Sequence, residues 1–94
     1  MITHQDTYIT RLGTRFTFGF ELKDGNYRVI ILDQPAYNGR DENGHIIHVI
    51  RDGDDRLICW TGPVPTLGDA KIVAALWADL TEKYIISGEP FPST

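Results

Sequence analysis

The sequence predicts an α+β domain, in which an antiparallel β-meander of about five strands precedes one C-terminal α-helix packed on one face of the sheet. Two observations lead to this prediction. Turn-forming Gly, Asn and Asp recur between short segments rich in β-branched and aromatic residues. The last third instead has the 3.6-residue periodicity of a helix. We expect one compact domain over 1–94, with the meander at about 7–61, a linker at 62–66, the helix at about 67–87 and a tail at 88–94.

The first three strands form the best-marked part of the meander. A short strand over 7–12 ("TYITRL") leads to the clearest one, 15–22 ("RFTFGFEL"). Its apolar side chains alternate with polar ones, which predicts one face packed beneath the helix. A base-stacking surface would need basic neighbours on that face, but Arg15 falls on the other. An Asp-Gly turn then leads to a strand over 26–33 ("NYRVIILD"). The apolar face contains Phe16, Phe18, Phe20 and Leu22.

Two further strands are expected at 45–51 ("HIIHVIR") and 56–60 ("RLICW"), joined by an acidic turn. The length of this turn stays open. A four-residue loop over 52–55 places His48 directly opposite Cys59, and a two-residue turn at Asp52-Gly53 makes them diagonal neighbours on one face. A three-residue loop places the two side chains on opposite faces.

The helix is predicted from its caps as well as from its periodicity. Thr66 can accept a hydrogen bond at the N-terminus, with Asp69 three residues later. Gly88 is a natural C-terminal stop, and the tail beyond it, "EPFPST", is expected to be loosely held. The expected apolar stripe contains Val73, Leu76, Trp77, Leu80 and Tyr84.

Two strands are apolar on both faces, and such strands are usually buried on both. In the strand over 26–33, Ile30 and Leu32 point away from Val29 and Ile31. One helix can cover only one face of the sheet. The second face must therefore be covered by curling of the sheet, by another protein or by a second copy of the chain, as in a homodimer through this uncovered face.

Composition and charge exclude several classes of protein. Nine Lys and Arg against thirteen Asp and Glu give a net charge of −4, which disfavours nucleic-acid binding through phosphates. A single Cys allows no intramolecular disulfide. Because the N-terminal segment is polar and no apolar run approaches about 20 residues, we expect a cytoplasmic protein without a membrane span.

The sequence contains one pair of residues that could support catalysis. His48 and Cys59 could form an imidazole–thiol pair, so a small thiol-dependent enzyme is an alternative function. No motif for an oxyanion site accompanies them, and Cys59 between Ile58 and Trp60 is expected to be buried. His45 and His48 lie on opposite faces of a strand and match no zinc motif. We expect no metal and no cofactor.

The first functional hypothesis is a small non-enzymatic protein-interaction module, a regulator, adaptor or inhibitor that acts by binding a partner protein. Inhibitors encoded by phages and other mobile elements are often of this size. The acidic turns could steer a basic partner, and Trp60 is either a surface anchor or a residue packed on the helix. The partner-binding candidates are Asp41, Glu42, Ile47, Val49, Asp52, Asp54, Asp55 and Trp60.

Overall fold

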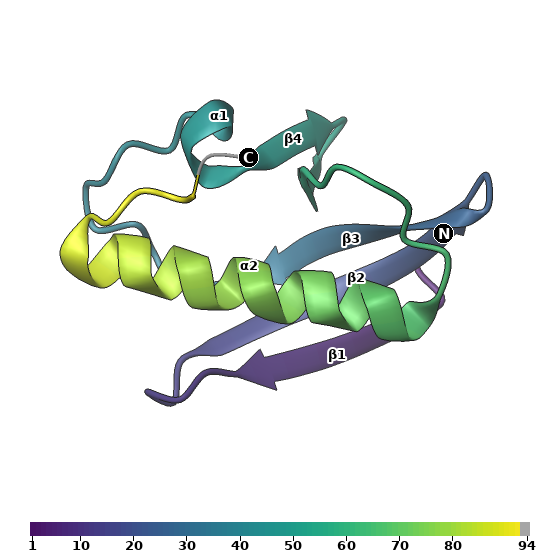
Figure 1. Cartoon of the computed structure of the whole chain (residues 1–94), viewed down its shortest axis with the longest axis horizontal. Helices are drawn as coiled ribbons and strands as arrows, with labels where there is room; N and C mark the ends of the chain where they lie inside the picture. Colours follow the sequence, from purple (N-terminus) through teal and green to yellow (C-terminus); the bar gives the residue numbers. More distant parts are fainter. Residues whose placement is uncertain (93–94) are drawn as a thin grey trace.

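The computed structural model describes residues 1–92 and confirms the fold class: a five-stranded antiparallel sheet with a C-terminal helix packed against it (Figure 1). The strands and helices, in chain order, are β1 (His4–Ile9), β2 (Arg15–Lys23), β3 (Asn26–Asp33), α1 (Gly44–Ile47), β4 (Val49–Asp52), β5 (Asp55–Ile58) and α2 (Leu67–Ser87).

The strand order β1-β2-β3-β5-β4 differs from a simple meander in its last step. After β3 the chain does not turn back at once but passes the C-terminal end of α2, where the Tyr84 hydroxyl donates to the Asp41 carbonyl at 2.8 Å. β4 then forms the edge of the sheet, and β5 returns beside β3, with Ile30 paired to Leu57. In the last hairpin, the second strand, β5, therefore lies next to β3, and the first strand, β4, lies at the edge.

The core lies between the sheet and α2, as the alternation in 15–22 predicts, but the prediction is wrong for Leu22, which is exposed near the end of β2. Phe16, Phe18 and Phe20 are almost fully buried on the helix-facing side of β2. Phe16 and Phe18 each meet the Trp77 ring edge-on, with ring centroids 6.0 Å apart. Edge-to-face pairs of this kind add to the free energy gained from burying the rings. The aromatic face of β2 is thus structural.

α2 begins and ends where its caps predict. The Thr66 hydroxyl accepts a hydrogen bond from the Asp69 amide at 3.0 Å. Gly88 adopts a left-handed conformation with φ 73°, and its amide donates to the Tyr84 carbonyl. This conformation is one that glycine adopts without a steric cost. The prediction of the apolar stripe is wrong for Leu76, which is exposed to solvent.

The predicted strand over 45–51 is wrong in its first half, which forms the short helix α1. The Asn43 side chain accepts from the His45 amide at 2.9 Å and caps this turn. The Trp77 indole donates to the Ile47 carbonyl at 2.9 Å, which fixes α1 over the core. His48, at φ 54°, ends the turn, and β4 begins one residue later. The Asn-Gly pair at 43–44 is the local signal for this start.

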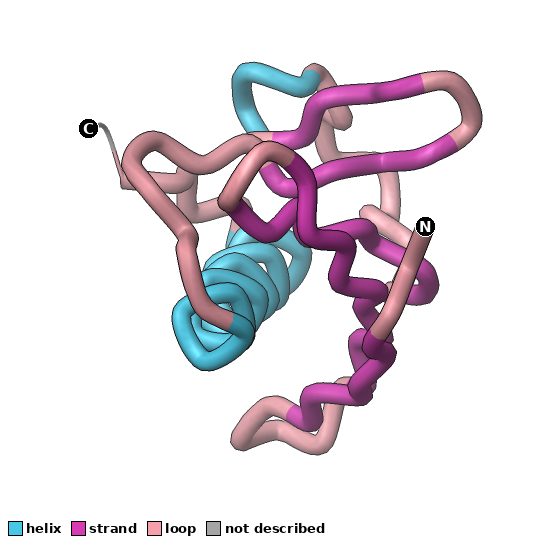
Figure 2. The backbone as a smooth tube through the Cα atoms, turned by 90° about the vertical axis from the view of Figure 1, so that its right-hand side faces the viewer, coloured by secondary structure: helices cyan, strands magenta, loops and turns pink. Residues whose placement is uncertain are grey.

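The second face of the sheet is partly covered by the chain's own N-terminal segment. Ile2 lies over Gly19, where an added Cβ would sit 2.6 Å from the Ile2 Cδ1 atom. Gly19 pairs with Ile30, which is only 2% exposed. Figure 2 shows the sheet bending around α2 instead of lying in one plane. Leu32, in contrast, remains exposed at the end of β3.

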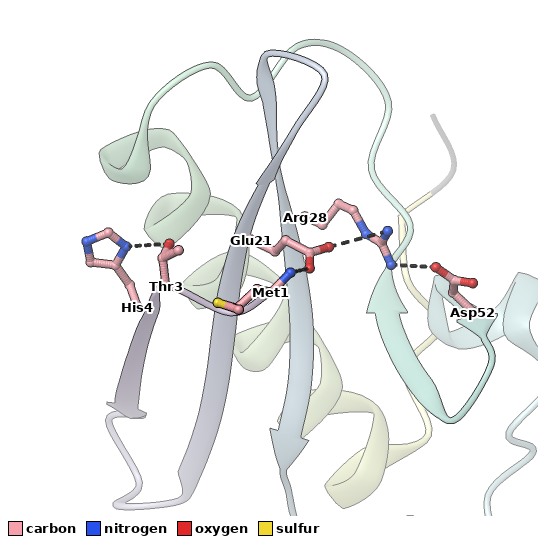
Figure 3. Close-up of polar contacts among 6 residues, drawn as sticks. All are labelled: Met1, Thr3, His4, Glu21, Arg28 and Asp52. Carbon is pink, nitrogen blue, oxygen red and sulfur yellow. Dashed lines mark hydrogen bonds and ion pairs between the residues drawn. The ribbon is translucent and has the colours of Figure 1, made fainter.

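An ion-pair network on this outer face connects the last hairpin to the rest of the sheet (Figure 3). One Arg28 nitrogen lies 2.6 Å from the Asp52 carboxylate, and another lies 3.4 Å from that of Glu21. The Met1 ammonium also contacts Glu21 and lowers the pKa of this carboxyl group. Arg28 thus links β2 and β3 to the start of the hairpin turn.

The C-terminal segment folds back onto the core, so the expectation of a loosely held tail is wrong for 88–92. Phe91 is buried, and its ring centroid lies 4.8 Å from that of His48 and 6.4 Å from that of Tyr84. The rest of the predicted tail, 93–94, lies outside the described residues. Neither helix within 1–92 is both long and apolar enough to cross a membrane.

Candidate partner-binding site

A groove of about 660 Å³ lies between α1 and the β4–β5 hairpin. We call it the hairpin groove. It collects residues from the start of α1, from β4 and from the segment after β5. Its lining contains Gly44, His45, His48, Val49, Ile50, Cys59, Trp60 and Thr61.

The turn at α1 sets one wall of the groove. Gly44 packs against the backbone of β4 so closely that an added Cβ would lie 2.5 Å from the Val49 carbonyl oxygen. The left-handed conformation of His48 then redirects the chain from α1 into β4. Glycine at 44 and the turn at 48 therefore place α1 against the start of β4.

The hairpin register brings the two sides of the groove together. Arg51 pairs with Arg56, the register expected for a four-residue loop. The pairing continues to Asp52 and Asp55, however, so the turn is two residues long, at 53–54. The Cys59 amide donates to the His48 carbonyl at 2.8 Å, so these two residues lie opposite each other. The register left open by the sequence is thereby fixed.

Apolar side chains dominate the accessible part of the groove. Trp60 is 47% exposed and Ile50 is 51% exposed, while Val49 is half-buried between them and the core. Large apolar side chains that line a concave surface are typical of binding sites. Of the two alternatives for Trp60, the structure shows the exposed one.

Two sequence predictions about this region are wrong. Cys59 is exposed, because β5 ends at Ile58 and the chain then leaves the sheet. Ile47, predicted as a surface candidate, is 3% exposed and belongs to the core. The outward apolar residue of this segment is Ile50, whose side chain shares the face of Leu57 opposite it. A helical turn in place of a strand over 45–48 causes this change.

The His48 ring and the Cys59 thiol do not form a hydrogen-bonded pair within residues 1–92. The His48 ring packs on Phe91, and the Cys59 thiol makes no hydrogen bond to an imidazole of the described chain. No cluster of three or more His, Cys, Asp or Glu within that range could hold a metal ion. The arrangement is suited to contact with apolar groups.

The acidic candidates lie outside the groove and in two separate groups. Asp41 and Glu42 are exposed in the loop before α1. Asp52 is engaged by Arg28, whereas Asp54 and Asp55 are exposed at the tip of the hairpin. The structure does not bring the two groups together, since α1 and β4 separate them. Neither group lines the groove.

The sequence reasoning missed Gly44, His45, Ile50 and Thr61 as lining residues. For Gly44 and His45 the Asn-Gly helix start was an available signal. No local signal marks Thr61, which reaches the groove only because the chain leaves the sheet after β5. Comparison with protein-family models, with curated proteins and with solved structures finds no match for this chain.

Proposed function

We propose that the chain is a non-enzymatic protein-interaction module that binds a partner protein through the hairpin groove. As a regulator, adaptor or inhibitor it would act by occupying a surface of that partner. The observation that carries the proposal is the concave apolar surface formed by Trp60 and Ile50, both about half exposed. Trp is among the residues that most often dominate the free energy of binding at interfaces.

Charge suggests the chemistry of the partner. Asp54 and Asp55 are exposed at the tip of the hairpin that forms one side of the groove, and the chain carries a net charge of −4. Acidic groups at the rim of an interface accelerate association with a basic surface. We expect the partner to insert an apolar side chain beside Trp60 and to place Lys or Arg near the hairpin tip. A cytoplasmic setting, with the Cys59 thiol reduced, fits this proposal.

The test is affinity capture from native cells followed by measurement of binding to the recovered protein. Trp60→Ala should weaken that binding at least about 30-fold, the range of interface hot spots. Ile50→Ala should weaken it less, because a smaller side chain is removed. Leu22→Ala removes an equally exposed apolar residue that does not line the groove and is the matched control. Circular dichroism must show that all three variants fold.

Retention of full affinity by both groove variants would contradict the proposal. Reduced affinity on raising the salt concentration would support the acidic tip, and Asp54→Asn with Asp55→Asn should remove that salt dependence.

A second candidate, a thiol-dependent enzyme, rests on the exposed Cys59 opposite His48. Cys59→Ser separates the two functions. The interaction proposal expects nearly unchanged partner binding, because Ser preserves the shape of this lining residue. A catalytic thiol would instead lose turnover of its substrate in this variant while the fold and the binding remain intact.

A further inference from the structure

The two edges of the sheet differ in how they are protected. At the β4 edge, α1 packs against the Val49 carbonyl at the start of a strand of only four residues. At the other edge, β1 has six residues, no proline and no lysine. Natural sheets usually shorten, charge or cover an edge strand to prevent it from pairing with another chain. β1 has only one of these protections, a single carboxylate.

The backbone groups of β1 that face outward can be identified from its pairing with β2. The Thr10 amide donates to the Thr14 carbonyl, and alternate residues of β1 therefore bond to β2. Gln5, Thr7 and Ile9 direct their backbone groups away from the sheet. The Thr7 amide donates instead to the neighbouring Asp6 carboxylate at 3.0 Å, which is consistent with this direction.

Two contacts between β1 and α2 place opposite charges symmetrically about Thr7. On one side, Lys71 lies 3.6 Å from the Asp6 carboxylate. On the other side, the Tyr8 hydroxyl donates to Asp79 at 2.9 Å. Lys71, Asp79, Asp6 and Tyr8 thus form a polar row along this edge, with the Lys71–Asp6 ion pair at one end and the Asp79 carboxylate at the other.

We propose that β1 pairs in antiparallel fashion with β1 of a second copy of the chain, about a two-fold axis at Thr7. Thr7 then lies opposite Thr7, and Gln5 lies opposite Ile9. Asp6 lies opposite Tyr8 of the second copy, with about 5 Å between their Cβ atoms. Lys71 of each copy thereby approaches Asp79 of the other.

In this register the Lys71 ammonium of each copy would lie between Asp6 of its own chain and Asp79 of the other, and so bridge the two carboxylates. An axis at Asp6 would place the two Asp6 carboxylates opposite each other, which is unfavourable. An axis at Gln5 would place Tyr8 opposite Ile2 and move Asp79 away from Lys71. Of these three axes, only the one at Thr7 brings Lys71 of each copy to Asp79 of the other. The interface is on the opposite edge of the sheet from the hairpin groove, so it is independent of partner binding there.

Sedimentation velocity over a range of protein concentrations tests the proposal. The wild-type chain should form a dimer. Lys71→Glu and Asp79→Lys should each weaken association about ten-fold or more, because each change creates two like-charge contacts. In an equimolar mixture of the two variants, the introduced glutamate of one chain meets the introduced lysine of the other. The unchanged Asp79 of the first chain then meets the unchanged Lys71 of the second, so the mixture should dimerise again.

A backbone variant provides a second readout. Thr7→Pro removes an outward amide that β2 does not use and should abolish the dimer, whereas Thr7→Val keeps the amide and should preserve it. A wild-type chain that stays monomeric up to its solubility limit would overturn the proposal. So would a dimer that persists in Thr7→Pro, or a mixture of the two charge variants that remains monomeric although each variant is folded.

Discussion

The hydroxyl groups of Tyr8 and Tyr37 lie in different surroundings, but in both cases the surroundings raise the pKa. The hydrogen bond to Asp79 raises the pKa of the Tyr8 hydroxyl. Burial raises the pKa of the Tyr37 hydroxyl, although the nearby Arg56 charge opposes it. Both phenols therefore keep their protons in the folded protein at a pH where an unfolded tyrosine, with a pKa of about 10, begins to lose its own.

This difference predicts how stability depends on pH. Above a pH of about 10 the folded state binds more protons than the unfolded state, so the free energy of unfolding falls as the pH rises further. Below about pH 9 the two groups make no pH-dependent contribution. The free energy of unfolding, measured by urea denaturation, should fall between about pH 8 and about pH 10.5. This fall should be smaller in the double variant Tyr8→Phe/Tyr37→Phe than in the wild type. An equal loss in both proteins would contradict the prediction.

Among the elements, α1 depends on one small residue. Because a Cβ at Gly44 would lie 2.5 Å from the Val49 carbonyl, Gly44→Ala must displace α1 from the edge of β4. We expect a loss of about 1–3 kcal/mol in the free energy of unfolding, measured by urea denaturation. Gly68→Ala in α2 is the matched control.

At Gly68 the nearest atom to an added Cβ is the Thr66 hydroxyl, at 3.8 Å, which is ordinary contact. Alanine is favoured over glycine within a helix, so Gly68→Ala should leave the protein unchanged or stabilise it by up to about 1 kcal/mol. If both variants lost the same free energy, the close packing of α1 on β4 would not be the cause.

Elements with complete local signals were predictable from the sequence, and those decided by distant contacts were not. The strand over 26–33 and the helix over 67–87 have caps, turns and periodicity that agree, and their bounds match the structure. The segment "HIIHVI" fits a strand and a helical turn equally well. Its outcome is decided by Ile47 and its hydrogen bond to Trp77, thirty residues away. The groove could not be foreseen because it depends on that turn.

Among the proposed site residues, the sequence identified Val49, Cys59, Trp60 and His48, and all four line the groove. It did not predict the exposure of Cys59, because burial preferences describe a residue type and not the point where a strand ends. Nor could the sequence predict that Asp52 forms an ion pair while Asp54 and Asp55 do not engage Arg28. The partner of Asp52, Arg28, lies 24 positions earlier in the chain.

At the scale of the whole molecule, the strand order and the path of the C-terminal segment unite distant parts of the chain. β5 lies beside β3, and Phe91 closes over His48 and Tyr84, so the last hairpin is held from both sides. No rule of local sequence fixes either feature, because both follow from which apolar surfaces remain uncovered once the other elements have packed.

The contribution of the C-terminal segment can be measured directly. Phe91→Ala should lower the free energy of unfolding by about 3 kcal/mol or more, because it leaves a cavity beside His48 and Tyr84. Phe91→Leu retains most of the apolar volume and should cost less than about 1.5 kcal/mol. Urea denaturation of both variants checks the prediction. A Phe91→Ala variant as stable as the wild type would show that this segment contributes little.

Every residue that lines the hairpin groove lies within 44–61, yet the supports of the groove lie elsewhere. Trp77 holds the Ile47 carbonyl, and Phe91 holds the His48 ring. A synthetic peptide of residues 44–61 would therefore carry all the lining side chains without the scaffold that shapes them. It would have to lose much conformational entropy to reproduce the surface, and it would compete weakly with the intact chain.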